Sequence, residues 1–176
     1  EIQFLMRNLE LQQHFIADLK KVLNESLEGA VISDMRQKNE PLIYCNDTFI
    51  EMTGYERDEV IGRNCKFLQK DDNQQEALIE LRTALKNHEP CKVVLRNYKK
   101  SGELFYNRLS VSPISNKNGE VTHYLGIQDD VTDIIALDRK LQELDEERKV
   151  LTTEVHHRVK NNLAVMSSLM ELESSK

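Results

Sequence analysis

The fold class is decided by residues 91–131, whose sequence is CKVVLRNYKKSGELFYNRLSVSPISNKNGEVTHYLGIQDDV. Apolar and polar residues alternate in three segments of this stretch, 91–100, 103–114 and 120–131, and the turn sequences KSG and NKNG separate them. Alternation at period two is typical of strands with one buried face, and short glycine-containing loops join antiparallel neighbours. The stretch is therefore predicted to form three consecutive antiparallel strands.

Two further strands and several helices are expected before this stretch. GAVISDM (29–35) and PLIYCN (41–46) predict a hairpin around the polar turn RQKN. Residues 46–69 contain three short helix-like pieces, and residues 72–88 show the apolar spacing of a fuller amphipathic helix. Two strands, then helices, then three strands predict an α+β domain built on a five-stranded antiparallel sheet.

Glycine and proline mark off two helical flanks. All six glycines lie between Gly29 and Gly126, and all three prolines lie between Pro41 and Pro113. Because these residues break helices, the chain before and after can be helical throughout. Residues 1–27 have the pattern of an amphipathic helix. The C-terminal flank carries a heptad seam made of Ile134, Leu137, Leu141, Leu144, Arg148, Leu151 and Val155. Such a seam predicts a coiled-coil homodimer.

Charge and cysteine usage exclude several classes of protein. Lys and Arg number 24 against 30 Asp and Glu, a net charge of −6, which argues against a nucleic-acid partner. No apolar run could span a bilayer, and the start EIQFLMRNLE lacks the basic region of a signal peptide. We therefore expect no membrane contact and a cytoplasmic location. Cys45, Cys65 and Cys91 show no metal or disulfide spacing, so no metal site is expected.

Three carboxamides share strand faces with apolar residues. Period-two parity places Asn97, Asn107 and Gln128 on the apolar faces of the last three predicted strands. If these faces point inward, each amide needs partners, because an unpaired buried polar group costs roughly 1–3 kcal/mol. A flat heterocycle with an imide edge would satisfy several amides at once. The alternatives are that the amides pair with each other or with backbone, or that the strands face outward.

The segment GRNCKFLQ (62–69) resembles the light-oxygen-voltage (LOV) photoreceptors, a PAS-fold family that binds flavin mononucleotide (FMN). The resemblance extends over about residues 28–132, through FIEMTGY, RNYKKSGELFYN and YLGIQDD. It implies that Cys65 forms a reversible thioether to the flavin C4a after blue-light absorption. The family usually has arginine after this cysteine, where the chain has Lys66, and Arg82 falls where a second phosphate-binding arginine is expected. Lysine lacks the bidentate fork, so FMN is expected to bind less tightly, with FAD as the lesser alternative.

The same resemblance implies roles for the amide residues. Asn64 and Gln69 would contact the ribityl chain and the isoalloxazine ring. Asn97 and Asn107 would pair with the pyrimidine edge. Gln128 would contact flavin N5 and O4, and its amide would reorient when N5 gains a proton. Asn97, Asn107 and Gln128 are the three residues that strand parity had already placed on apolar strand faces.

The sequence EVHHRVKNNLAVMSSLMELE (154–173) is similar to the dimerisation and phosphoacceptor helix of HisKA_2/HWE-type histidine kinases, which is marked by HRxKNxL. The resemblance implies that His157 is the phosphoacceptor and His156 its neighbour. An exposed neutral imidazole can accept a phosphoryl group near pH 7. No glycine-rich phosphate-binding stretch or second kinase subdomain is recognised, so the chain alone is expected to be inactive as a kinase.

Together the two resemblances predict the blue-light sensor module of a dimeric histidine kinase. The expected parts are an N-terminal A'-type helix (1–27), a LOV domain (28–132), a J-type signalling coiled coil (133–153) and the first part of the phosphotransfer helix (154–176). In the full-length parent the expected partner is a response regulator. The rival interpretation is a light-independent ligand- or redox-sensing PAS module whose helices serve only dimerisation.

Overall fold

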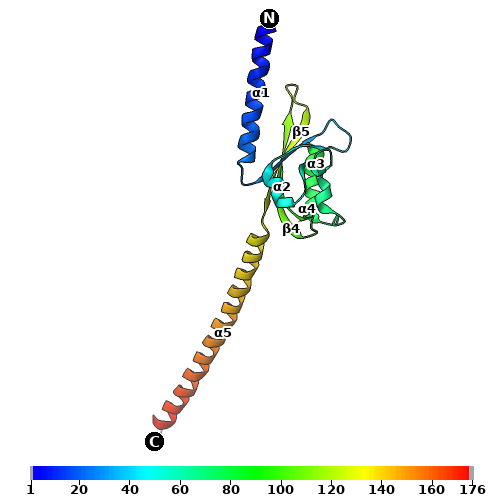
Figure 1. The fold of residues 1–176 in the computed structure, drawn as a ribbon. Helices are drawn as coiled ribbons and strands as arrows, with labels where there is room; N and C mark the ends of the chain where they lie inside the picture. The colour runs from blue at the N-terminus through cyan, green and yellow to red at the C-terminus, as the bar shows by residue number, and fades with distance from the viewer. Residues whose placement is uncertain (1, 175–176) are drawn as a thin grey trace. The chain divides into compact units, whose positions relative to one another are not determined.

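A five-stranded antiparallel sheet forms the centre of the first part of the chain. The computed structural model describes the backbone of residues 2–174, and their side chains except at 2, 4–6, 8, 9, 12, 15, 165 and 167–174. The strands are β1 (Gly29–Asp34), β2 (Leu42–Cys45), β3 (Cys91–Tyr98), β4 (Leu104–Ser115) and β5 (Val121–Asp130). Their spatial order is β2-β1-β5-β4-β3. Figure 1 labels β4 and β5, which are neighbours in this order. The predicted α+β fold is confirmed.

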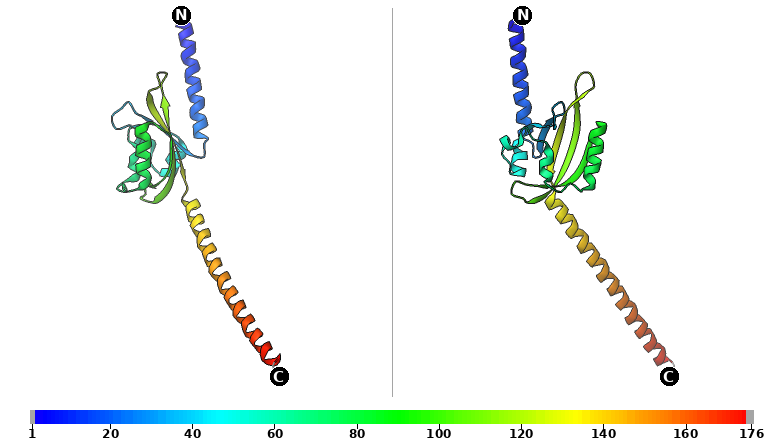
Figure 2. Two further views of the ribbon diagram at one scale, coloured as in Figure 1. Left: turned by 180° about the vertical axis from the view of Figure 1, so that it is seen from behind. Right: turned by 90° about the vertical axis from the view of Figure 1, so that its right-hand side faces the viewer.

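Four helical segments join β2 to β3. They are α2 (Asp47–Thr53), α3 (Arg57–Val60), the 3₁₀ helix η1 (Cys65–Gln69) and α4 (Glu76–Asn87). Figure 2 shows α4 lying against one face of the sheet, where it forms a buried cluster with β3, β4 and β5. This cluster comprises Leu78, Leu81, Val93, Leu95, Leu109, Val111 and Tyr124. A second cluster joins the short helices to β1 and β2 through Val31, Leu42, Cys45, Phe49, Val60 and Leu68.

The three carboxamides predicted from strand parity do face inward. Asn97 is 2% exposed, Asn107 1% and Gln128 0%. Their strands are paired in register, with Leu95 opposite Asn107 and Leu109 opposite Gln128. The possibility that these strands present their amides to solvent is therefore excluded.

The predicted helix over residues 72–88 begins later, and α4 spans Glu76–Asn87. The side chains just before it are used to contact β3. The carboxylate of Asp72 pairs with the Arg96 guanidinium through two contacts of 2.7 Å. The carboxamide of Gln75 bonds to the Arg96 backbone. These tertiary contacts take the place of a first helical turn.

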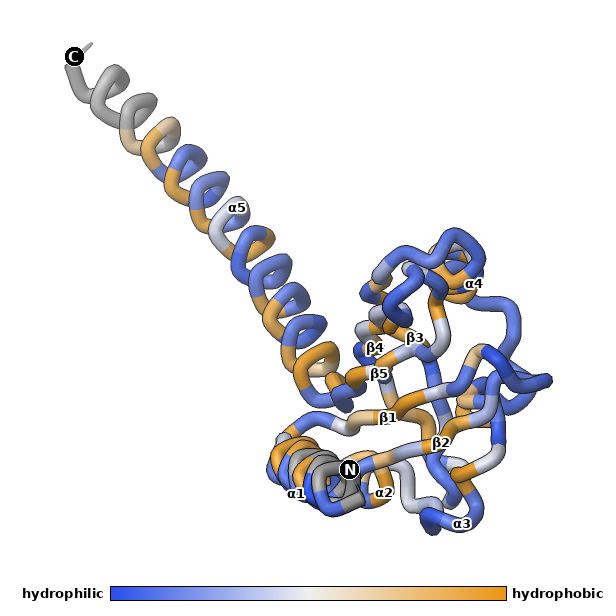
Figure 3. The backbone as a smooth tube through the Cα atoms, turned by 90° about the horizontal axis from the view of Figure 1, so that it is seen from above, coloured by the Kyte–Doolittle hydropathy of each residue, from blue (hydrophilic) through white to orange (hydrophobic). Residues whose placement is uncertain are grey.

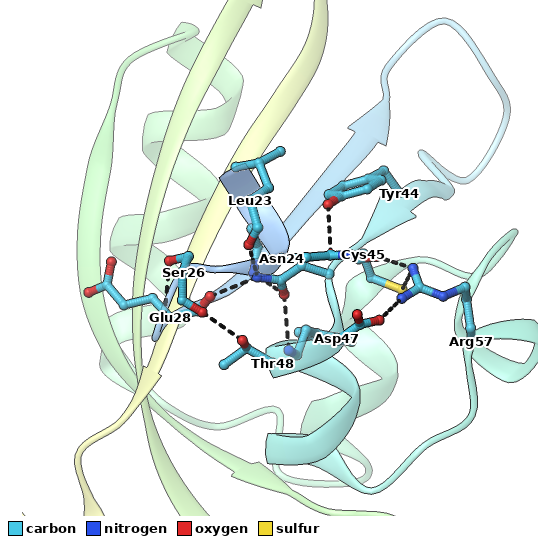
Figure 4. Close-up of polar contacts among 12 residues, drawn as sticks. Leu23, Asn24, Ser26, Glu28, Tyr44, Cys45, Asp47, Thr48 and Arg57 are labelled. Atoms are coloured by element: carbon cyan, nitrogen blue, oxygen red, sulfur yellow. Dashed lines mark hydrogen bonds and ion pairs between the residues drawn. The ribbon is translucent and has the colours of Figure 1, made fainter. Parts of the chain in front are cut away.

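A single buried asparagine fixes the end of the N-terminal helix α1 (Ile2–Asn24) to the sheet. Asn46 Nδ2 donates to the carbonyl oxygens of Leu23 (2.7 Å) and Glu28 (2.9 Å), two residues that are labelled in Figure 4. Its Oδ1 accepts from the N–H groups of Ala30 (2.8 Å) and Phe49 (3.0 Å). Asn46 is also the N-cap of α2, so one side chain ties together α1, β1 and α2.

The C-terminal helix α5 (Thr132–Ser174) is continuous, and residues from Asp133 onward form a separate unit. Figure 3 shows apolar residues recurring along α5 between polar ones. The apolar members of the predicted heptad seam are all exposed: Ile134, Leu137, Leu141, Leu144, Leu151 and Val155. Within residues 2–174, no helix is both long enough and apolar enough to cross a bilayer.

Candidate functional site

A cavity of ≈ 350 Å³ lies in the sheet domain, between the inner sheet face and the helical segments. Its volume is within the range of small-molecule sites. Segments far apart in the sequence contribute to its wall, including η1, α4 and all five strands. Every cofactor-binding candidate named from the sequence lines it: Asn64, Cys65, Lys66, Gln69, Arg82, Asn97, Asn107 and Gln128.

Most of the cavity wall is apolar. The side chains responsible are Val31, Met35, Leu42, Leu78, Leu81, Leu85, Leu95, Leu109 and Val111. Gly126 also lines the cavity, and a Cβ at that position would lie 3.0 Å from Val31 Cγ2. A side chain at this position would therefore require Val31 to shift by a few tenths of an ångström. A wall of this kind favours a largely apolar ring system.

The three inward carboxamides form a hydrogen-bonded row at the cavity. Asn107 Nδ2 donates to Asn97 Oδ1 (2.8 Å) and to Gln128 Oε1 (2.6 Å). The amides thus pair with each other, as one of the alternatives from the sequence allowed. The pairing is incomplete, because the buried Asn107 Oδ1 has no hydrogen-bond partner among the described residues. A ligand N–H at this point would satisfy it.

Cys65 opens η1, and the preceding Asn64 sets the local backbone. Asn64 Oδ1 accepts from Lys66 N–H (3.0 Å), and Asn64 Nδ2 donates to Asn39 O (2.8 Å). Gln128 Nε2 lies 4.0 Å from Cys65 Sγ, a weak contact. Burial raises the pKa of the Cys65 thiol to about 12, while the Gln128 amide acts in the opposite direction. At neutral pH Cys65 therefore carries its proton.

Two cations at the cavity could hold an anion. Lys66 follows Cys65 in η1, and Arg82 lies on α4. Neither side chain has an ion-pair or hydrogen-bond partner among the residues that the structure describes. Gln69 and Asn73 line the same cavity and add polar groups. The cavity thus combines an apolar wall with an amide row, a neutral thiol and two unpaired positive charges.

Sequence reasoning missed three polar residues of the wall. Ser33 lies on β1 with the parity of Val31, so the period-two pattern of that strand could have identified it. Glu40 and Asn73 lie in irregular segments, where no periodic pattern indicates which way a side chain points.

His157 lies on α5 and is exposed. It is two positions from Val155 and two from Val159, and at 3.6 residues per turn it therefore lies on the side of the helix opposite these valines. His156 instead borders a groove that also contains Leu151 and Val155 of the seam. Pairing of the seam would leave His157 accessible.

Two protein families match separate parts of the chain. Residues 28–133 match the PAS domain family, and residues 154–176 match a histidine kinase family. A blue-light-activated histidine kinase from Rhizobium johnstonii is 38% identical over 145 residues, covering 82% of this chain and 41% of that protein. Blue-light-activated histidine kinase 2 from Erythrobacter litoralis is 40% identical over 144 residues, covering 82% and 40%. The chain spans about two fifths of the length of these curated relatives.

A solved structure also matches the sheet domain. The LOV domain of a blue-light activated histidine kinase from Erythrobacter litoralis superposes with a TM-score of 0.58 at 37% sequence identity. The match covers 61% of this chain and 99% of that domain.

Proposed function

Because the chain belongs to the light-oxygen-voltage group of the PAS domain family, we propose that it is the blue-light-sensing module of a histidine kinase. Its cavity holds a flavin, and Cys65 is the residue that reacts. The observation that carries this proposal is the meeting of the Cys65 thiol with the row of Asn97, Asn107 and Gln128 at one cavity.

The residues of the cavity fit FMN. The unpaired buried Asn107 Oδ1 is suited to accept from the imide N–H of the pyrimidine edge. Lys66 and Arg82 are suited to bind the phosphate, since neither charge is neutralised by a described residue. Bound flavin would supply blue-light absorption and an electrophilic ring carbon, C4a. FMN is preferred to FAD because these two cations match a single terminal phosphate.

The neutral state of Cys65 suits the proposed photochemistry. With flavin bound, Cys65 would supply the sulfur that adds reversibly to the electrophilic ring carbon, and its thiol would give up the proton. The raised pKa supports this step, because the thiol must hold the proton that N5 receives. Gln128 would then turn its amide so that its oxygen could accept from a protonated flavin nitrogen, and this reversal would break the present bond from Asn107. Breaking that bond alters β5 two residues before Asp130.

The change in β5 reaches α5 through the end of the strand. Asp130 Oδ1 accepts from the Thr132 N–H (3.0 Å) and from the Thr132 hydroxyl at the start of α5. The chain forms a homodimer through its flanking helices, because the exposed seam of α5 needs a partner of the same kind. The dimer in the cytoplasm presents His157 to the ATP-binding domain of the parent. A response regulator then receives the phosphoryl group.

Flavin extraction tests the binding part of the proposal. The purified chain incubated with FMN and desalted should retain a yellow chromophore, and acid extraction followed by chromatography should identify it as FMN. Substitution of Lys66 and Arg82 together by methionine should weaken FMN binding more than riboflavin binding. A colourless protein that cannot take up FMN would favour the light-independent PAS module.

Phosphoryl transfer tests the kinase part. The chain fused to the rest of a related kinase should become labelled from ATP in a light-dependent manner. His157→Ala should abolish the label and Cys65→Ala should make it light-insensitive, whereas the control His156→Ala should keep it. Label that survives in His157→Ala and maps to His156 would reassign the acceptor, and label on neither histidine would remove support for the kinase role.

A further inference from the structure

The free edge of the sheet is closed next to the cavity by one glutamine side chain. β3 is an edge strand, since β4 is its only neighbour in the strand order. Gln75 Oε1 accepts from the Arg96 N–H (2.7 Å), and Gln75 Nε2 donates to the Arg96 carbonyl (3.0 Å). Gln75 is 6% exposed. Its carboxamide thus pairs with the edge as the peptide of a further strand would.

The peptide that Gln75 holds also holds the first amide of the cavity row. The Arg96 carbonyl accepts a second hydrogen bond, from Asn97 Nδ2 (2.9 Å). Asn97 Oδ1 in turn accepts from Asn107 Nδ2, which also donates to Gln128. A continuous chain of hydrogen bonds therefore runs from Gln75, which does not line the cavity, through the three amides that do.

Two neighbouring residues make it possible to distinguish a specific role of this contact from a general contribution to stability. Asp72 also ties down Arg96, but through the guanidinium and not through the peptide. Gln74, adjacent to Gln75, is exposed. Comparison of substitutions at these positions can therefore distinguish an effect on the Arg96 peptide from an effect on the attachment of α4.

Building on the proposed function, we infer that Gln75 is a positioning residue for the flavin. It fixes the Arg96 peptide, and that peptide sets the orientation in which the Asn97 carboxamide meets the pyrimidine edge. Without Gln75, the Arg96 N–H loses its partner and must recruit water, and the Arg96 carbonyl keeps only the bond from Asn97. The peptide is then free to tilt, and Asn97 loses its fixed acceptor.

The test replaces Gln75 with methionine, which has similar length but no amide, and uses Gln74→Met as the matched control. In the flavin-free protein, the Arg96 amide hydrogen should exchange at least tenfold faster in Gln75→Met, and the side-chain NH₂ resonances of Asn97 should shift. In the loaded protein, the C2 and C4 carbonyl stretching bands of FMN should move and the Kd should rise about tenfold. Asp72→Asn should leave the carbonyl bands in place.

Three results would overturn the inference. One is a Gln75→Met protein whose exchange, carbonyl bands and Kd match those of Gln74→Met. Another is lower stability with unmoved carbonyl bands, which would make Gln75 only a brace. The third is an equal band shift in Asp72→Asn. If Gln75→Met does not fold, Gln75→Glu serves instead, since it keeps an acceptor for the Arg96 N–H and removes the donor to the carbonyl.

FMN binding by the unaltered chain distinguishes failure of the proposed function from failure of the Gln75 assignment. If the unaltered chain binds no FMN, the light-sensing proposal is wrong, and the role of Gln75 toward a flavin is wrong with it. If the unaltered chain binds FMN and Gln75→Met behaves like Gln74→Met, only the assignment of Gln75 is wrong.

Discussion

Replacing Asn107 with leucine should affect the empty and the flavin-loaded protein to different extents. In the empty protein, Asn107 Oδ1 is buried without a described partner, and leucine removes this unfavourable atom. Leucine also leaves Asn97 Oδ1 and Gln128 Oε1 without their shared donor. Each unpaired buried polar atom costs roughly 1–3 kcal/mol, and the variant removes one such atom while it creates two. The free energy of unfolding of the empty protein should therefore fall by roughly 1–3 kcal/mol, the cost of one unpaired acceptor.

In the loaded protein the opposing effect is absent. A leucine at position 107 would face the flavin imide N–H, and an unpaired buried donor costs roughly 1–3 kcal/mol. At about 1.4 kcal/mol per factor of ten, FMN binding should weaken roughly 5- to 150-fold. Saturating FMN should then stabilise Asn107→Leu by less than it stabilises the unaltered chain, because ligand binding and folding are linked.

Urea unfolding with and without FMN, together with a fluorescence titration of FMN, measures both quantities. The expected result is a larger loss of stability in the loaded protein than in the empty one, together with a raised Kd. An equal loss of stability in both forms, with an unchanged Kd, would refute the idea that Asn107 meets the flavin.

Three further predictions follow from the cavity. Only a thiolate reacts with iodoacetamide, and burial raises the pKa of Cys65 to about 12. The rate of Cys65 alkylation in the empty protein should therefore rise about tenfold per pH unit between roughly pH 8 and 10. A rate that reaches a plateau in this range, followed by peptide mass spectrometry, would contradict this. Gln128→Leu should keep Cys65 photochemistry while reducing the light-dependent change in hydrogen exchange over 133–155; an unchanged response would exclude Gln128 as the relay. Gly126→Ala should weaken FMN binding several-fold, because its Cβ would lie 3.0 Å from Val31 Cγ2, and titration would show unchanged affinity if the strands adjust.

The sheet could be predicted because its pattern is local. Side chains alternate across a strand, so period two along β3, β4 and β5 placed Asn97, Asn107 and Gln128 on the apolar faces of their strands. The structure then shows that these faces point inward. The start of α4 could not be predicted in this way. Asp72 and Gln75 have acceptable helical propensity, and only the position of Arg96 on the neighbouring strand explains why the helix begins after them.

The polar contacts of the site were predictable only in part. Asn46 precedes a helix-like segment, so its role as N-cap could have been read from the sequence, but its bonds to Leu23 and Glu28 depend on where α1 ends. Gln75 shows the same limit more clearly. A pattern indicates which side chains are buried, whereas their hydrogen-bond partners are set by segments distant in the sequence.

The most direct test of the light-sensing proposal is one absorption difference spectrum. The FMN-loaded chain is measured in darkness, after blue illumination and again after recovery in darkness, beside Cys65→Ala. We expect the blue-absorbing flavin band to bleach and return in the unaltered chain, with the Cys65→Ala protein staying yellow and unbleached. Reversible bleaching that persists in Cys65→Ala, or an FMN-loaded chain that does not bleach at all, would contradict the assignment of Cys65 as the photoreactive residue.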